Sequence, residues 1–212
     1  MSDWSGTYPV SIALVHYPTV DKAGTVTATS TTNFDIHDLA RLARTYSLAQ
    51  YYVVTPVPSQ VTFTRRIIEH WDEGWGGQYN PTRKEAMRTI EVCRDLNEVA
   101  AHIAQARGRS PRFVMTTARR LPHRISFERL AQLVGEALAG AAGARSGAES
   151  AVEFCIVFGT GWGLHPSLIE DMDYVLEPIP GLGDDYNHLS VRAAAAIIVD
   201  RLIQGVKSSV RG

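Results

Sequence analysis

Short, predominantly apolar runs recur along the chain, and segments with helical periodicity separate them. The runs predict strands at residues 10–15, 51–55, 113–116, 152–158 and 174–176. A strand that is apolar on both faces belongs in a sheet covered on both sides, and helices between strands let neighbouring strands run parallel. The sequence therefore predicts an α/β fold built on a parallel sheet.

The segments between these runs predict the helices. Apolar residues recur every three to four positions within residues 34–46, and Asn33 or Asp35 can cap the first turn. Similar patterns predict helices at residues 61–71 and 126–139, one or two helices at 90–106, a short helix from Pro166 and a final helix at 189–206. The glycine-rich residues 71–83 predict a loop or a small excursion, and residues 139–150 a flexible surface connection. We expect a single domain over residues 1–212.

Composition narrows the class of protein. With 45% hydrophobic and 20% charged residues the 212-residue chain can bury a full core, and its net charge of −1 gives no global attraction for nucleic acid. The sequence has no signal-peptide pattern and no run near the ~20 apolar residues that cross a bilayer. Cys93, in a helix-like segment, and Cys155, in a strand-like one, show no CxxC spacing and predict reduced core residues. These features indicate a cytoplasmic globular protein.

Three backbone turns late in the chain form a candidate binding site. Residues 153–163 (EFCIVFGTGWG) predict a buried strand ending in a glycine turn, residues 179–181 (IPG) a second turn, and residues 187–191 (NHLSV) the capped start of a helix. Glycine lets backbone N–H and C=O groups approach a ligand closely, so these turns can enclose a flat heteroaromatic molecule without charged side chains.

This pattern differs from two common nucleotide sites. GTGWG departs from the GxGxxG dinucleotide fingerprint and occurs near residue 160, whereas the fingerprint opens its domain on the first βα turn. No GxxxxGK[ST] phosphate loop occurs in the sequence. We therefore reject both of these nucleotide-binding folds.

Three motifs, in order, resemble the SPOUT superfamily of RNA methyltransferases, and its SpoU branch in particular. They are residues 33–45 (NFDIHDLARLART), residues 158–164 (FGTGWGL), and residues 179–181 (IPG) followed by 188–194 (HLSVRAA). Over residues 10–202 the chain also resembles a compact bacterial group of SAM-dependent RNA methyltransferases carrying the strings LVHYP, NFDIHD, YNPTR, FGTGWGL and YNHLSVR. The resemblance implies a SPOUT fold with a C-terminal deep trefoil knot at approximately residues 152–206, and a homodimer paired through the knot region.

The resemblance also implies S-adenosylmethionine (SAM) as the cofactor. The methyl group of SAM is already electrophilic, so a protein has mainly to align it with a nucleophile and exclude water. The residues expected to bind SAM are Thr116, Thr117, Ala118, Phe158, Gly159, Thr160, Gly161, Gly163, Ile179, Pro180, Gly181, His188, Leu189 and Ser190. Trp162 and Tyr186 can stack on adenine or on a target base.

The first motif carries the expected contact with the acceptor. Arg41 aligns with the catalytic arginine of the family, and Asn33 with the asparagine that opens the same helix. Because a guanidinium is normally protonated, positioning a phosphate is the role that we expect of Arg41.

The third motif departs from the family. His188, Ser190 and Arg192 stand where the SpoU pattern has serine, asparagine and serine. Ser190 and the neighbouring Asn187 are the catalytic candidates that this leaves. His37 and His188 are possible proton carriers, although a lone histidine is more often a packed residue.

Clustered arginines predict contacts with RNA phosphates. Residues 107–124 contain no acidic residue, so this stretch can form a basic stripe despite the near-neutral net charge. The residues expected to bind RNA are Arg41, Arg44, Arg119, Arg120 and Arg124. The seven histidines show no HxH, HExxH or Cys/His spacing, so we expect no metal site.

The predicted activity is methyl transfer from SAM to RNA, with the SpoU resemblance favouring a ribose 2′-hydroxyl in tRNA or rRNA. Methylation of a base nitrogen, as in guanine-N1 methylation, is the leading alternative, and Asp184 or Asp185 could then take the ring proton. The altered third motif keeps open a SAM- and RNA-binding module without catalysis. A metabolic nucleotide-binding enzyme is a third hypothesis.

Overall fold

The computed structural model describes residues 8–119, 121–143, 152–182 and 186–211. Within them lie the strands β1 (Val10–Val15), β4 (Tyr51–Val54), β5 (Ile90–Cys93), β6 (Ser110–Met115), β7 (Arg124–Ile125), β8 (Val152–Gly159) and β9 (Tyr174–Leu176). These seven described strands form one sheet in the order β5-β4-β1-β8-β6-β9-β7, and each neighbouring pair is parallel. The predicted α/β fold with a parallel sheet is confirmed.

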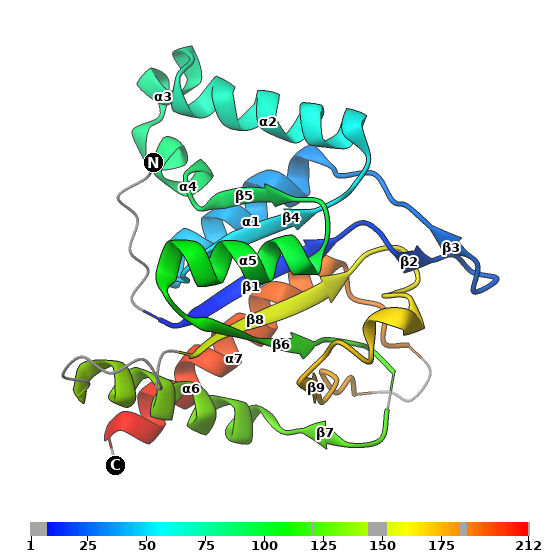
Figure 1. The fold of residues 1–212 in the computed structure, drawn as a ribbon, viewed down its shortest axis with the longest axis vertical. Coiled ribbons are helices and arrows are strands. Elements are labelled where there is room, and N and C mark those ends of the chain that lie inside the picture. The colour runs from blue at the N-terminus through cyan, green and yellow to red at the C-terminus, as the bar shows by residue number, and fades with distance from the viewer. Residues whose placement is uncertain (1–7, 120, 144–151, 183–185, 212) are drawn as a thin grey trace.

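Helices cover both faces of this sheet (Figure 1). On one face lie α1 (Asn33–Thr45), α4 (Pro81–Met87), α6 (Phe127–Gly143) and α7 (Val191–Arg211), whose apolar residues share a core with alternate residues of β1 and β8. On the other face lie α5 (Leu96–Arg107) and the segment that contains the 3-10 helix η1 (Pro166–Leu168). The helix α2 (Pro58–Asp72) packs Ile67, Ile68 and Trp71 against the first core. Burial on both faces explains why the strands lack polar alternation.

The parallel register gathers several loops at one edge of the sheet. Leu14 pairs with Phe158 and Val15 with Gly159, so β1 and β8 end side by side. Met115, the last residue of β6, pairs with Val157. The loops that follow β1, β6, β8 and β9 therefore all leave the sheet at the carboxyl ends of its strands. Ligands bind at these ends in open parallel sheets.

A small hairpin between β1 and α1 was not predicted. Its strands β2 (Thr19–Val20) and β3 (Val26–Thr27) pair antiparallel. The Val20 N–H donates to the Gly163 carbonyl at 3.0 Å, and the Trp162 N–H donates to the Val20 carbonyl at 3.1 Å. The hairpin thus braces the glycine turn after β8, and its two-residue strands are too short to leave a periodic pattern in the sequence. The two-residue strand β7 was not predicted, for the same reason.

Residues 90–106, predicted to contain one or two helices, contain one helix, but the segment starts with a strand that was not predicted. Ile90–Cys93 forms strand β5, and α5 begins only after Asp95, whose side chain accepts a hydrogen bond from the Glu98 N–H. Val92 pairs with Val53, so contact with β4 decides the strand. Four residues at a sheet edge carry too little pattern to distinguish a strand from a helical turn.

Residues 71–83, predicted to form a loop or a small excursion, are largely helical. After α2 ends at Asp72, α3 (Trp75–Tyr79) and α4 follow, and the Asn80 side chain caps α4 by accepting from the Arg83 N–H. A β-carbon at Gly76 would stand 2.9 Å from the Trp71 ring, so this glycine permits close packing rather than a flexible loop.

Several element boundaries differ from prediction by a few residues. The helix α6 extends to Gly143, so residues 139–143 of the predicted flexible connection are helical, while residues 144–150 lie outside the described residues. The last helix begins at Val191 instead of Leu189. Thr32 caps α1, and Asp35 completes a capping box with it, instead of Asn33 or Asp35 acting as the cap.

Two other sequence predictions concern the core and the membrane. Cys93 and Cys155 are buried and free, as expected of core residues, although Cys93 ends a strand rather than lying in a helix. Among the described helices, none has the length and apolar character needed to cross a bilayer.

Candidate functional site

The loops after β6, β8 and β9 meet at the carboxyl edge of the sheet. Thr116 follows β6 and donates through both its backbone N–H and its hydroxyl to the Val157 carbonyl, at 3.0 and 2.9 Å. The Asn187 side-chain amide donates to the Ile179 carbonyl at 3.2 Å and to the Ala118 carbonyl at 3.5 Å. Asn187 therefore ties the loop after β6 to the segment after β9. The structure thus joins residues 116–118 to residues 179–181 of the predicted cofactor site, and β8 places residues 159–163 at the same end of the sheet.

The glycine turn after β8 is rigid on one side and open on the other. Gly161 has φ +62°, and a β-carbon there would stand 3.2 Å from both the Val20 carbonyl oxygen and Thr29 Cγ2. Gly163 has φ +114°, and no atom lies within 4 Å of the place that its β-carbon would occupy. The turn is fixed by the hairpin at Gly161 and has free space at Gly163, where a ligand can approach the backbone.

Two other predicted residues of this turn point their side chains away from that space. Phe158 is buried in the core at 2% exposure. The Thr160 hydroxyl donates to the Val15 carbonyl at 2.9 Å and lies 2.5 Å from Thr29 Oγ1. Only the backbone of these two residues is therefore available to a cofactor.

A buried imidazole supports the same turn. His16, directly after β1, is fully buried, and its Nδ1 lies 3.0 Å from Thr29 Oγ1. One donor order satisfies the whole chain: Nδ1–H donates to Thr29, Thr29 to Thr160, and Thr160 to the Val15 carbonyl. Burial lowers the pKa of His16 to about 4 although the Asp35 carboxylate acts to raise it, so the ring is neutral near pH 7. Its Nε2 has no hydrogen-bond partner among the described residues.

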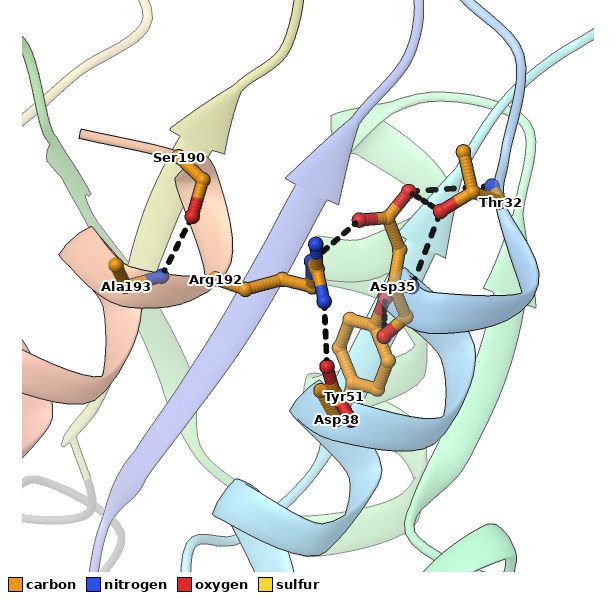
Figure 2. Close-up of polar contacts among 7 residues, drawn as sticks. All are labelled: Thr32, Asp35, Asp38, Tyr51, Ser190, Arg192 and Ala193. Atoms are coloured by element: carbon orange, nitrogen blue, oxygen red, sulfur yellow. Dashed lines mark hydrogen bonds and ion pairs between the residues drawn. The ribbon is translucent and has the colours of Figure 1, made fainter. Parts of the chain in front are cut away.

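Arg192 joins the first and third motifs (Figure 2). Its Nη1 donates to Asp38 Oδ2 at 2.6 Å, and its Nε lies 3.8 Å from Asp35 Oδ1. Asp35 Oδ2 accepts from the Thr32 hydroxyl at 2.6 Å and from the Thr32 N–H at 3.1 Å. The guanidinium also lies 5.1 Å over the Phe34 ring. Arg192 thus forms ion pairs between α7 and α1.

Sequence reasoning missed this pair, although a signal was present. Asp35 and Asp38 are three residues apart on a predicted helix and therefore share one face. Ser190 caps α7, because its hydroxyl oxygen accepts from the Ala193 N–H at 3.3 Å (Figure 2).

Arg41 and Arg192 line a groove of about 300 Å³ between α1 and α7. The other walls are Asp38, Leu39, Leu42, Thr45, Tyr46 and Ala196. Arg41 is exposed and makes no hydrogen bond or ion pair with any residue that the structure describes. Asn33 does not line this groove; it is exposed at the start of α1 and lines a separate cavity between α1 and α2.

The other predicted RNA-binding arginines lie elsewhere on the surface. Arg44 forms an ion pair with Glu85 at 3.2 Å, so its charge is partly neutralised. Arg119 is exposed in the loop after β6, and Arg124 is exposed at the start of β7. Arg120 lies outside the described residues.

Exposed aromatic rings flank the glycine turn. Trp162 is 52% exposed and Tyr186 75% exposed. Both rings stand edge-to-face with His188, with centroids 6.5 Å and 5.2 Å away. Leu189 is half exposed next to them. This cluster offers apolar ring surface to a flat ligand beside the turns.

These residues fit an adenosine-containing cofactor by their chemistry. Backbone carbonyls and amides of three loops, open space at Gly163 and nearby aromatic rings suit an uncharged heteroaromatic ring. The cavity in the α1–α7 groove and the cavity between α1 and α2 do not include these loops. Among the described residues, no group of three or more His, Cys, Asp or Glu is placed to hold a metal ion.

Comparison with known proteins gives a match to a family model. The model of a family described as SAM-dependent RNA methyltransferase matches residues 9–204. The chain is 42% identical over 193 residues to an uncharacterized protein of Aquifex aeolicus, covering 91% of this chain and 87% of that protein. It is 38% identical over 191 residues to a protein of Oleidesulfovibrio alaskensis named tRNA (guanine-N(1)-)-methyltransferase. That match covers 90% of this chain but only 41% of the relative.

The fold is also similar to solved structures. One is the SpoU methyltransferase AviRb from Streptomyces viridochromogenes in complex with AdoMet, with a TM-score of 0.53 and 13% identity. The match covers 93% of this chain and 58% of that chain. At this identity the likeness concerns the fold alone.

Proposed function

Because the chain belongs to the family of SAM-dependent RNA methyltransferases, we propose that it methylates the ribose 2′-hydroxyl of a nucleotide in tRNA or rRNA. Membership of the family makes the protein a methyltransferase with SAM as cofactor and RNA as substrate. The observation that carries the proposed site is that Asn187 ties the loop after β6 to the segment after β9, at the end of the sheet where β8 places its glycine turn. By the same resemblance we propose that the protein works as a cytoplasmic homodimer.

The three loops hold the cofactor in this proposal. Residues 116–118, 159–163 and 179–181 supply backbone groups to the adenosine part, and Trp162 or His188 supplies ring surface. Bound there, SAM supplies an electrophilic methyl group. His188, Leu189 and Ser190 border these loops at the start of α7, while Asn187 and Thr160 keep the loops in place through their side chains.

The α1–α7 groove holds the acceptor strand. Arg41 and Arg192 place two guanidinium groups in it, and Arg41 has no other partner among the described residues, so it positions a backbone phosphate. Contacts to the sugar-phosphate backbone orient a ribose directly, which supports the 2′-hydroxyl as the acceptor. The Ser190 oxygen accepts from Ala193, so its hydroxyl proton stays available to donate to a phosphate.

Methylation of guanine N1 is the second candidate. It is favoured by the name of the Oleidesulfovibrio alaskensis relative, a tRNA (guanine-N(1)-)-methyltransferase. The chain spans about two fifths of that relative, so the named activity can reside in the part that the chain lacks.

The two acceptors are distinguished by one experiment. Purified protein is incubated with SAM and total bacterial tRNA or rRNA, and the RNA is digested to nucleosides for mass spectrometry. Methyl on the sugar fragment supports the proposal, and methyl on the guanine fragment supports the alternative. We expect Arg41→Ala to lower turnover at least about 100-fold with SAM affinity unchanged, since it removes an acceptor contact only. Arg44→Ala, which removes an ion-paired charge on the same helix, is the control.

A further inference from the structure

A second cavity, of about 400 Å³, lies between α1 and α2 and is separate from the α1–α7 groove. Its walls are Asn33 and His37 from α1 and Phe63, Arg66, His70 and Trp71 from α2. Figure 1 shows α2 beyond the β5 edge of the sheet, on the same side of the molecule as α4. The methyl-transfer site proposed above does not use this cavity.

The two aromatic residues of the cavity differ in the contacts that their rings already make. The Trp71 ring stands edge-to-face with His37 and His70, with centroids 5.5 and 5.1 Å away, and the Arg83 guanidinium lies 4.8 Å from its centroid. Phe63 is 41% exposed and makes no ring contact with another described aromatic residue. Trp71 therefore forms a fixed wall, while the Phe63 ring is available for stacking.

The charge of the cavity suits an anion. Arg66 is exposed and makes no hydrogen bond or ion pair with any described residue, and no acidic side chain lines the cavity there. The nearby Asp72 carboxylate is already paired with Arg88 at 2.8 Å and with Lys84 at 3.7 Å. A free guanidinium beside an unpaired aromatic ring can bind a phosphate and the base of one nucleotide together.

The helix α1 contributes residues to both this cavity and the acceptor groove. His37 in the cavity and Arg41 in the groove are four residues apart, which is roughly 6 Å along the helix axis. A strand that crosses α1 can therefore contact both places.

We propose that this cavity binds a second nucleotide of the RNA substrate, with its base stacked on Phe63 and its phosphate on Arg66. The inference rests on the proposed function for the identity of the ligand as RNA. It adds a contact outside the reaction centre that raises affinity and selects how the strand lies across α1.

The test compares Phe63→Ala and Arg66→Ala with Arg65→Ala. Arg65 is the neighbouring exposed arginine of α2 and does not line the cavity, so it controls for loss of one positive charge. The readouts are the KM for total bacterial tRNA in methyl transfer, kcat, SAM affinity by calorimetry, and anisotropy of fluorescein-labelled tRNA. We expect each cavity variant to raise KM and Kd about fivefold or more, with kcat and SAM affinity unchanged, and Arg65→Ala to change neither appreciably.

Salt dependence separates the two roles. Arg66→Ala is expected to reduce the slope of log K against log salt by about 0.7 to 0.9, one phosphate contact, whereas Phe63→Ala leaves the slope unchanged. Cavity variants that bind tRNA like Arg65→Ala would overturn the inference. If the wild-type protein transfers no methyl to RNA, the proposed function fails, and the anisotropy measurement still decides whether the cavity binds RNA.

Discussion

At the residue scale, one neutral histidine holds the end of the central strand. His16 is fully buried and connects through Thr29 to Thr160, in the turn that we propose as part of the SAM site. The pattern of the sequence marks His16 only as a residue after a strand. Its burial and its partners come from the hairpin and the turn, which lie 13 and 144 residues further along the chain.

Stability is expected to fall in acid because of this residue. The pKa of His16 is lowered from 6.5 to about 4 by burial, so the unfolded chain binds a proton between these values that the folded chain does not. The contribution of His16 to stability is therefore full above pH 6.5 and is lost as the pH falls toward 4. Relative to His16→Asn, which keeps a donor near the Nδ1 position, the wild type should lose roughly 2 kcal/mol more between pH 7 and 4.5. Urea denaturation at both pH values measures this, and equal losses in the two proteins would contradict it.

Gly161 gives a second prediction at this scale. Its φ of +62° strains any side chain, and a β-carbon would stand 3.2 Å from two atoms of the hairpin region. Gly161→Ala should lower stability by about 1–2 kcal/mol and SAM affinity on the order of tenfold, because the turn must shift. Gly108→Ala is the control, since Gly108 has φ +60° with nothing within 4 Å. Gly108→Ala should lower the unfolding temperature because of the backbone strain, and it should bind SAM normally in calorimetry. Equal SAM affinities of the two variants would refute the role of the turn.

At the element scale, the start of α1 is fixed by a capping box that also presents Asp35 to Arg192. The Thr32 hydroxyl accepts from the Asp35 N–H at 3.2 Å and donates to the Asp35 carboxylate. Asp35 is 7% exposed, whereas Asp38 and Arg192 are partly exposed. The ion pair of Arg192 with Asp38 therefore orients the two helices more than it stabilises them.

Removing the cap should have a measurable cost. Thr32→Ala is expected to lower the free energy of unfolding by about 1 kcal/mol, because it leaves the first turn of α1 and the Asp35 carboxylate without the hydroxyl. Thr32→Ser keeps the hydroxyl and should lie within a few tenths of a kcal/mol of the wild type. Guanidinium unfolding of both variants checks this, and identical losses would show that the cap is not the cause.

Elements with a continuous apolar run or a clear helical period were predictable, even the short strands β4 and β9, and elements without one were not. The strands β1, β4 and β8 and the helices α1 and α6 carry enough apolar residues for their periods to be recognised. The strand β5, the helix α3 and the strands of the hairpin each have fewer than six residues. Their structure is determined instead by contact with β4, with Trp71 and with the glycine turn, respectively. Local sequence is weak wherever tertiary contact supplies most of the energy.

At the scale of the whole molecule, the family, the cofactor and the SPOUT fold agree with the prediction from the sequence. The knot at residues 152–206, the homodimer and the role of each site residue stay predictions. Exposed apolar residues gather near the start of α7, with Leu182 fully exposed and Leu189 at 47%. A second copy of the chain at this place would bury them.

The dimer prediction has a direct measurement. Light scattering on the protein as it elutes from a size-exclusion column should give twice the 23.3 kDa chain mass. Leu189→Arg places a charge in the proposed interface and should shift the protein toward the monomer mass. Val26→Arg, at an exposed apolar residue of β3, should leave the mass unchanged. A monomeric wild type would contradict pairing through this region.

The sequence by itself determined the α/β class, the parallel sheet and, through the order of the three motifs, the family and its cofactor. Apolar strands, helical periods and glycine turns are local properties of the sequence. They can therefore be recognised without knowing which residues lie close together in the fold. Tertiary structure alone decided that Asn187 ties two loops, that Arg192 pairs with Asp38, and that Asn33 lies in another cavity than Arg41. These contacts join residues that are 8 to 154 positions apart, so only the packing of helices on the sheet brings their atoms within hydrogen-bond distance.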